Sequence, residues 1–346
     1  MLRSPSEDED SVELPLFDFH SILVATNNFD MENKLGQGGY GPVYKGTLQD
    51  GKVMAIKRLF SSSSQGIGEL KNEMKLISKL QHRNLVRLLG CCIEREEKIL
   101  IYEYTPNKSL DTYLFDPARK AKLDWTTRFN IIIRVARELL YLHRDSCLRV
   151  IHRYLKIINI LLDEKMNPKI SDFGLARIFE GTQDLESTHK VVGTICYMAP
   201  EYMLGGVFLE KSDIFNFGVL ILEIISGRKA NSFKYDKQYT SLLAYAWQCW
   251  SASKGVQMVD EALADSFSSS KVSRCVNIGL LCVQDHAADR PTMATIVSML
   301  SGEQTKPPEP NQPTFMFKNI SNNNFQSQSN STWSANNVIE SIIEPR

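Results

Sequence analysis

A glycine-rich run at residues 36–43 limits the possible folds of this chain more than any other segment. It reads Gly-Gln-Gly-Gly-Tyr-Gly-Pro-Val, which fits the spacing G-x-G-x-x-G-x-V. Glycines let the backbone approach phosphate oxygens and offer them N–H donors. A dinucleotide-binding fold would place such a run between a strand and a helix, whereas here both flanking segments have strand-like patterns. Taken alone, the run is equally consistent with a simple hairpin turn.

Composition narrows the class of protein. The chain has 346 residues, of which 43% are hydrophobic and 23% charged, and this excludes a wholly disordered or collagen-like chain. Its formal net charge is 0, so it lacks the basic excess of a nucleic-acid binder, and we expect no nucleic-acid partner. The seven cysteines are scattered, which suits reduced thiols. The longest apolar stretch, near residues 215–225, is shorter than the about 20 residues of a membrane-spanning helix, so we expect no membrane-spanning segment and a cytoplasmic location.

The distribution of apolar, polar and charged residues along the sequence divides the chain into four parts. Residues 1–28 are predicted to be a flexible acidic segment, and residues 303–346 a polar, mobile tail. Residues 29–105 are mostly strand-like, with a hairpin turn at 49–51 and one helix near 66–80. Residues 106–302 are mostly helical. Asp124 is a candidate N-cap for a helix reaching residue 143, and Gly227 and Gly302 are candidate C-terminal stops of helices at 211–227 and 291–302.

Several short motifs follow the glycine run in a fixed order. A strand-like segment ends in Lys57, a cation able to reach two phosphate groups, and Glu73 lies on the next predicted helix, where it could face Lys57. Singly, each is more often an ordinary surface residue. Residues 151–159 read Ile-His-Arg-Tyr-Leu-Lys-Ile-Ile-Asn, and Asp172-Phe173-Gly174 and the triplet 199–201 follow. The shared order and spacing of these motifs exceed what chance would produce.

Residues 29–302 resemble the protein kinase superfamily, and most closely the plant receptor-like serine/threonine kinases of the S-domain (G-type lectin) and cysteine-rich groups. The segments that carry this resemblance include residues 34–46, 80–90 and 289–293. It implies an α+β, bilobal fold, with a small β-rich N-lobe containing one helix at about 29–105 and a larger α-helical C-lobe at about 106–302. It also fits the intracellular part of a plasma-membrane receptor-like kinase.

The resemblance implies ATP and Mg²⁺ as cofactors and gives roles to individual residues. Asn159 and Asp172 would bind the metal, Lys156 and Thr194 suit serine or threonine substrates, and Arg153 would receive a phosphate added to the activation loop, at Thr188 for example. Glu201 would pair with Arg290. The nucleotide would be surrounded by Gly36, Gly38, Gly41, Val43, Ala55, Lys57, Glu73, Tyr102, Glu103 and Thr105.

One residue departs from this pattern at the position of the catalytic base. The family motif His-Arg-Asp reads His152-Arg153-Tyr154 here. A phenol has an ordinary pKa of about 10, against about 3.9 for aspartic acid, so it is a poor base at neutral pH. A positioned base contributes roughly 10²–10⁴-fold in rate. Tyr154 is therefore predicted to be non-functional as a base, and its ring to fill the space of the substrate hydroxyl.

Two neighbouring departures fall in substrate-handling segments. Ile157 and Ile158 stand where the family has small or polar residues, and Cys196 stands where it has glycine. If that glycine needed a positive φ, cysteine there would cost about 1–2 kcal/mol. Each change alone is consistent with neutral drift, whereas their clustering in substrate-handling segments modestly favours drift after loss of selection.

Three functional hypotheses follow. The first is a nucleotide-binding pseudokinase or strongly impaired kinase that acts as a scaffold or allosteric partner of receptor kinases. The second is an active Ser/Thr protein kinase that transfers the ATP γ-phosphoryl group to protein hydroxyls. The third is an interaction module with a collapsed pocket. The implied partners are ATP and either protein substrates or partner receptor kinases. Restoring an aspartate at Tyr154 separates the first two.

Overall fold

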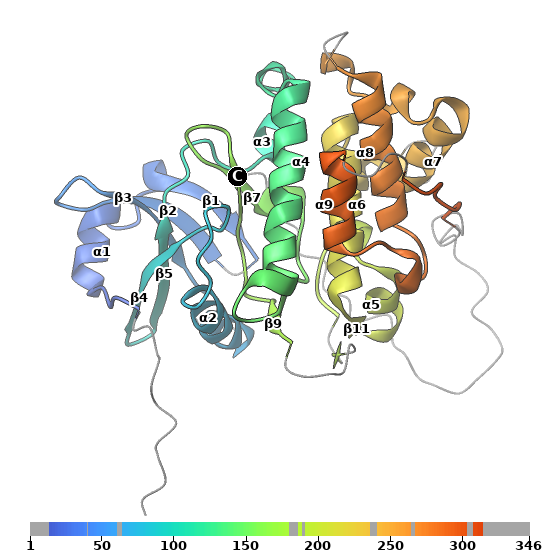
Figure 1. The fold of residues 1–346 in the computed structure, drawn as a ribbon. Coiled ribbons are helices and arrows are strands. Elements are labelled where there is room, and N and C mark those ends of the chain that lie inside the picture. Colours follow the sequence, from blue (N-terminus) through green and yellow to red (C-terminus); the bar gives the residue numbers. More distant parts are fainter. Residues whose placement is uncertain are drawn as a thin grey trace, which may run out of the picture.

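A computed structural model describes residues 14–39, 41–60, 64–179, 186–188, 191–235, 241–263, 267–302 and 307–313. The chain forms a sheet-containing N-lobe and a helical C-lobe (Figure 1). The N-lobe sheet has five antiparallel strands in the order β1-β2-β3-β5-β4. Their bounds are β1 (Lys34–Gly38), β2 (Gly41–Thr47), β3 (Val53–Arg58), β4 (Leu88–Glu94) and β5 (Glu97–Glu103). The predicted α+β, two-lobed class is confirmed.

The β2–β3 hairpin forms where the sequence predicts it. Thr47 pairs with Val53, and Gly51 adopts a φ of +83° in the turn, a conformation that glycine reaches without strain. Met54 and Ile56 alternate with more exposed neighbours along β3 and are fully buried, as period-two patterning requires. The helix predicted between β3 and β4 is present as α2 (Ser64–Ile77).

The segment before β1 is ordered from residue 14, contrary to the prediction of a flexible segment over residues 1–28. Residues 1–13 lie outside the described part. Pro15 O and Phe17 N bond the backbone of Cys91 on the β4 edge at 3.1 and 2.9 Å, and helix α1 (Phe19–Thr26) follows. Its buried Ile22 packs against Met54 and other apolar residues of the sheet. Helix α1 thus covers one face of the N-lobe sheet (Figure 1).

The C-lobe is built around two long helices, α4 (Trp125–Leu140) and the almost wholly buried α6 (Glu210–Ser226). The Asp124 side chain caps α4 by accepting from Thr127 N at 2.8 Å, as predicted. A π-helical turn, Tyr141–Asp145, carries α4 into the next segment. Gly227 and Gly302 end α6 and α9 in the left-handed conformation, also as predicted. The remaining helices are α3 (Asp111–Leu114), α5 (Pro200–Gly205), α7 (Leu242–Ser253), α8 (Ser269–Cys282) and α9 (Met293–Ser301).

Short strand pairs frame the segments between α4 and α6. Strand β6 (Val150–Ile151) pairs with β9 (Arg177–Ile178), and β7 (Ile160–Leu162) pairs with β8 (Pro168–Ile170). Strand β10 (Glu186–Ser187) pairs with β11 (Val207–Phe208). Residues 152–159 and 171–176 lie between these paired strands, so the two chemistry-bearing loops are held at both ends.

Part of the predicted mobile tail is docked on the C-lobe. The Asn277 amide of α8 donates to Pro308 O at 3.1 Å, and the Gln284 amide donates to Asn311 O at 2.9 Å. Pro310 and Pro313 are buried. Residues 303–306 and 314–346 lie outside the described part. In the ranges that are described, no helix combines the length and the apolar character needed to cross a membrane.

Candidate active site

Two carboxylates converge on the ammonium of Lys57 on β3. Glu73 Oε2, from α2, lies 3.4 Å from Lys57 Nζ, and Asp172 Oδ1 lies 3.2 Å from the same atom. All three groups are largely withdrawn from solvent, so these ion pairs are stronger than surface pairs. The anticipated Lys57–Glu73 pair is therefore present, and the sequence did not indicate that Asp172 joins it.

Asp172 and Asn159 belong to one connected segment. Asp172 has a φ of +71°, a left-handed conformation that an aspartate adopts at some cost. Asn159 O accepts from both the N–H and the hydroxyl of Ser171, at 3.0 and 2.9 Å, and its side-chain amide donates to Tyr154 O at 2.9 Å. Next to Asp172, the Phe173 ring meets the His152 ring edge-on at 4.8 Å. The catalytic-loop and Asp-Phe-Gly segments are thus locked together.

This donor set suits Mg²⁺ and a nucleotide phosphate. Asp172 offers a carboxylate and Asn159 an amide oxygen, and hard oxygen ligands are what Mg²⁺ prefers. Lys57 is a cation beside them. Replacing Lys57 by an apolar residue would leave the Glu73 and Asp172 carboxylates without this cation in a largely buried site.

The glycine run lies at the β1–β2 turn. Gly36 and Gly38 belong to β1 and pair with Val43 and Gly41 of β2. Gly41 has a φ of +145°, and a Cβ there would lie 1.9 Å from Arg58 O, so packing requires glycine at this position whatever ligand binds. On the neighbouring strands, Val43 pairs with Lys57, and Ala55 pairs with Tyr102 of β5.

The segment that leaves β5 carries the remaining predicted nucleotide contacts. Tyr102 is buried, and Thr105 is buried just beyond the strand. The Glu103 carboxylate accepts from Arg87 N and from Lys169 Nζ, each at 2.8 Å. One carboxylate oxygen of Glu103, Oε1, is therefore engaged by protein groups.

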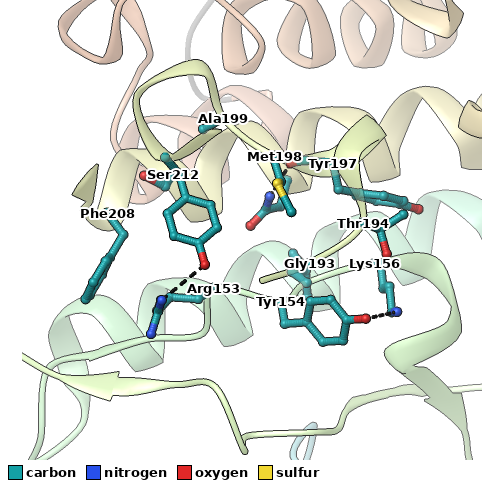
Figure 2. A pocket seen from close by; sticks show the side chains of 13 residues that line it. Arg153, Tyr154, Lys156, Gly193, Thr194, Tyr197, Met198, Ala199, Phe208 and Ser212 are labelled. Carbon is teal, nitrogen blue, oxygen red and sulfur yellow. Dashed lines mark hydrogen bonds between the residues drawn. The ribbon is translucent and has the colours of Figure 1, made fainter. Parts of the chain in front are cut away.

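Tyr154 fills the space beside the catalytic loop (Figure 2). Its side chain is only 5% exposed and clusters with Leu175 and Val192. The phenol oxygen accepts from Lys156 Nζ at 2.6 Å, and this ammonium also lies 3.9 Å from the ring centre. Tyr154, Lys156, Gly193 and Thr194 line one small pocket, so the substrate-handling residues predicted from sequence are brought together.

Arg153 lines the same pocket from its other end (Figure 2). Its guanidinium donates to Leu175 O and to the Tyr202 hydroxyl, both at 3.2 Å, and lies 4.0 Å from the Phe208 ring centre. Phe208 is on β11, which pairs with β10, and Thr188 directly follows β10. Arg153 thus contacts a residue of the strand pair that Thr188 follows, and its role as a phosphate receptor stays a prediction.

Cys196 does not strain the chain. It lies in a 3₁₀ turn, Ile195–Tyr197, with an ordinary backbone conformation, so the condition under which cysteine would be strained, a positive φ, is not met. The left-handed position is Gly193, with a φ of +152°. Ile157 is buried, and its N–H donates to the Tyr197 hydroxyl at 3.1 Å. The substrate-side loops are therefore regularly packed despite their unusual residues.

Two buried acids hold this region, and sequence reasoning missed both. Asp213 of α6 accepts from the backbone N–H groups of His152 and Arg153, each at 2.7 Å. Glu223 of α6 accepts from the Tyr197 hydroxyl and from Ala230 N. Burial raises the pKa of Glu223 to about 7. Only their position in an otherwise apolar helix could have pointed to them.

The predicted pair between Glu201 and Arg290 is present. Both carboxylate oxygens of Glu201 accept from the guanidinium, at 2.8 and 2.8 Å, in a two-pronged arrangement. Although burial acts to raise the pKa of Glu201, the bonds from Arg290 hold it below its ordinary value. This pair joins α5 to the chain before α9.

Comparison with known proteins agrees with this architecture. The profile of the family described as "Protein tyrosine and serine/threonine kinase" matches residues 29–300. The chain belongs to the protein kinase family. A G-type lectin S-receptor-like serine/threonine-protein kinase of Arabidopsis thaliana is 58% identical over 340 residues, covering 98% of this chain and 40% of the relative. A second such kinase of that plant is 60% identical over 314 residues, or 90% of this chain and 38% of the relative.

Relatives of this kind are longer than the present chain, which spans about two fifths of their length. The similarity to receptor-like serine/threonine kinases inferred from the sequence motifs is thus confirmed. What the relatives' names describe belongs to those proteins as wholes, and only the kinase-domain architecture is shared by direct comparison.

Proposed function

We propose that this kinase-family domain binds ATP with Mg²⁺ and transfers the γ-phosphoryl group slowly or not at all. The observation that carries the proposal is the buried Tyr154, whose hydroxyl is bonded to Lys156 Nζ at 2.6 Å where the family has its catalytic aspartate. The gathering of Lys57, Glu73 and Asp172 supports nucleotide binding. In a receptor-like context, such a domain acts at the plasma membrane as a partner of other receptor kinases.

The chemistry explains why transfer is impaired. With Mg²⁺ bound, the nucleotide supplies an activated phosphoryl group, and the metal neutralises its charge. Lys57, which is held by Glu73, would orient the phosphates, and Asn159 and Asp172 would supply oxygen ligands to the metal. A protein hydroxyl must lose its proton during transfer. The Tyr154 side chain is a phenol, with an ordinary pKa of about 10, and its oxygen already accepts from the Lys156 ammonium, so it is poorly suited to take up the substrate proton at neutral pH.

A second consequence concerns Lys156. Its ammonium is drawn to the Tyr154 hydroxyl and ring instead of lying open to a phosphoryl group. The pocket it lines with Thr194 and Gly193 is correspondingly narrow. The tyrosine at position 154 therefore has two effects: it replaces the carboxylate base of the family, and it engages the Lys156 ammonium.

The test compares the wild-type chain with Tyr154→Asp for phosphoryl transfer to itself and to a generic serine/threonine peptide. We expect Tyr154→Asp to be faster by at least about 10²-fold, the lower range of a positioned base. Tyr154→Phe, which keeps the ring and removes the hydroxyl, is the matched control and should remain as slow as wild type. Wild-type transfer equal to that of Tyr154→Asp refutes impaired catalysis and establishes an active Ser/Thr kinase.

Nucleotide binding is measured on the same proteins by thermal shift with ATP and Mg²⁺. A ligand that binds the folded state raises its melting temperature by mass action. Lys57→Met, which leaves two carboxylates without their cation, is expected to lose the shift. Absence of any shift in wild type at millimolar ATP, with normal folding, refutes nucleotide binding and favours the interaction-module hypothesis.

A further inference from the structure

Asn72, on helix α2, contacts the segment that follows Asp172 through one side-chain amide. Its Nδ2 lies 2.7 Å from Ala176 O, 3.0 Å from Gly174 O and 3.2 Å from Phe173 O. An amide NH₂ group has two hydrogens, so these three carbonyls share them in a fork. One side chain of the N-lobe thus satisfies three backbone acceptors more than a hundred positions along the chain.

These carbonyls belong to a segment that needs support. Asp172 holds a left-handed φ of +71°, which local forces do not favour. From the C-lobe side, Phe173 contacts the His152 ring, and Leu175 O accepts from the Arg153 guanidinium at 3.2 Å. From the N-lobe side, the Asn72 amide provides the corresponding hydrogen bonds.

The residues that flank this contact are the two acids of the site. Glu73 directly follows Asn72 on α2, and Asp172 directly precedes Phe173. Their carboxylates meet at Lys57 Nζ, at 3.4 and 3.2 Å. A fixed distance between Asn72 and the 173–176 backbone therefore fixes the separation of Glu73 from Asp172.

We propose that Asn72 is a positioning residue that clasps α2 to the 173–176 backbone and thereby holds Asp172 in place to receive the metal of a bound nucleotide. Asn72 itself touches neither phosphate nor metal in this scheme. Its loss should loosen one segment and weaken the metal-dependent part of nucleotide affinity, while leaving the metal-independent part intact. The affinity argument rests on the proposed nucleotide binding, whereas the loosening of the segment does not.

The test uses Asn72→Leu and Asn72→Asp, which have a similar shape but cannot donate to the carbonyls. Lys71→Leu, at an exposed neighbouring position on α2, is the matched control. Hydrogen exchange is followed by mass spectrometry on the full chain, comparing peptides that cover residues 172–178 with peptides from α6. We expect exchange at 172–178 to rise about tenfold in both Asn72 variants, the effect of losing roughly one net hydrogen bond, with α6 unchanged.

ATP affinity is then measured by calorimetry with Mg²⁺ and with a chelator. We expect both Asn72 variants to lose about tenfold in affinity with Mg²⁺ and little without it, and Lys71→Leu to match wild type in both. A merely structural role would lower both affinities together. Exchange at 172–178 that matches the control overturns the clasp, and an equal loss of affinity with and without metal overturns its link to Asp172. If wild type binds no nucleotide, the proposed function fails, and the exchange data still decide on the clasp.

Discussion

A single buried carboxylate, Asp213, holds the backbone turn that leads into Tyr154. Its oxygens accept from His152 N and Arg153 N, and one of them lies 3.0 Å from His143 Nε2. Arg153 has a φ of +65°, and a non-glycine residue in this region costs roughly 1–2 kcal/mol. The charge-assisted bonds to Asp213 offset that cost, so the turn before Tyr154 depends on one side chain of α6.

Asp213→Asn is expected to destabilise the fold in a pH-dependent way. Burial acts to raise the pKa of Asp213, but the bonds from His143 and from the backbone hold it below its ordinary value. A lowered folded pKa means that the carboxylate stabilises the fold above about pH 4 and loses this effect as pH falls through the folded pKa. At pH 7 the variant should lose about 2–3 kcal/mol of unfolding free energy.

The measurement is urea unfolding of wild type and Asp213→Asn from pH 7 down to the lowest pH at which both fold. Asp116→Asn, at a more exposed acid, serves as the control and should track wild type. A gap between Asp213→Asn and wild type that stays constant well below pH 4, where the carboxylate loses its effect, contradicts the account.

Among the elements, α4 combines what sequence can predict with what it cannot. Its N-cap and its apolar stripe follow directly from residue spacing. Glu138, near its end, is fully buried against the His82 imidazole, which contacts the Glu138 carboxylate and stacks on Tyr141. Helical spacing places Glu138 beside the stripe, and only the loop around residue 82, distant in sequence, decides that it is covered.

Glu138→Gln is expected to stabilise the fold at alkaline pH. Burial raises the pKa of Glu138 to about 8, with Lys169 opposing the shift. A raised folded pKa means that the unfolded chain releases the proton first, so stability falls as pH rises from the ordinary value of 4.5 to about 8. Glutamine does not titrate. The variant should therefore exceed wild type by on the order of 2–4 kcal/mol at pH 8 and by little at pH 5.

Denaturant midpoints at the two pH values check this prediction. The neighbouring charged groups, Arg83 and Lys169 beside His82 and Lys169 beside Glu138, are all retained in the variant, so Glu138 is the one titrating group removed. Equal stability of wild type and Glu138→Gln at pH 8 would show that the buried acid is compensated.

Sequence reasoning reached the elements whose signals are local. The β2–β3 hairpin, the Asp124 cap and the two glycine stops depend on a few adjacent residues, and all were predicted. Helix α1 was missed because its eight residues gain their stability from the sheet beneath them. Residues 307–313 were missed because their partners, Asn277 on α8 and Gln284 just after it, are distant in sequence.

The candidate site likewise has features that a sequence pattern predicts and features that depend on the three-dimensional arrangement of side chains. Lys57, Glu73, Asn159 and Asp172 were identified because their spacing resembles a known family pattern. The ring of Tyr154 was expected to fill a space, but its hydrogen bond to Lys156 depends on two rotamers that no sequence pattern specifies. The backbone conformation at Cys196 could likewise not be predicted from the sequence, because the positive φ in this segment belongs to Gly193.

Across the whole molecule, the two ends of the described chain each pack on a lobe. Residues 14–26 hydrogen-bond to the edge strand of the N-lobe sheet and pack on one of its faces. Residues 307–313 hydrogen-bond to C-lobe side chains. Helix α1 contributes Ile22, which is 1% exposed, to the apolar cluster of the sheet. The N-lobe therefore includes a segment that precedes residue 29.

Ile22→Ala is expected to destabilise the domain by about 2–4 kcal/mol, the range for truncating a buried aliphatic side chain. Val24→Ala, at a position of the same helix that is 56% exposed, is the matched control and should change stability by less than about 0.5 kcal/mol. Unfolding in urea measures both. Similar values for the two variants would show that α1 is not part of the cooperative N-lobe.

The buried triangle of Lys57, Glu73 and Asp172 restrains how such a sequence can evolve. Replacing Lys57 by an uncharged residue leaves both carboxylates without this ammonium in a poorly hydrated interior, and breaking a buried ion pair in this way costs about 3–5 kcal/mol. Selection for folding alone then preserves Lys57, even in a lineage released from any demand for turnover. Position 154 carries no comparable penalty, because a neutral ring packs there among apolar neighbours. Neutral substitutions are therefore expected at position 154, where the family has its catalytic base, before they are expected at Lys57.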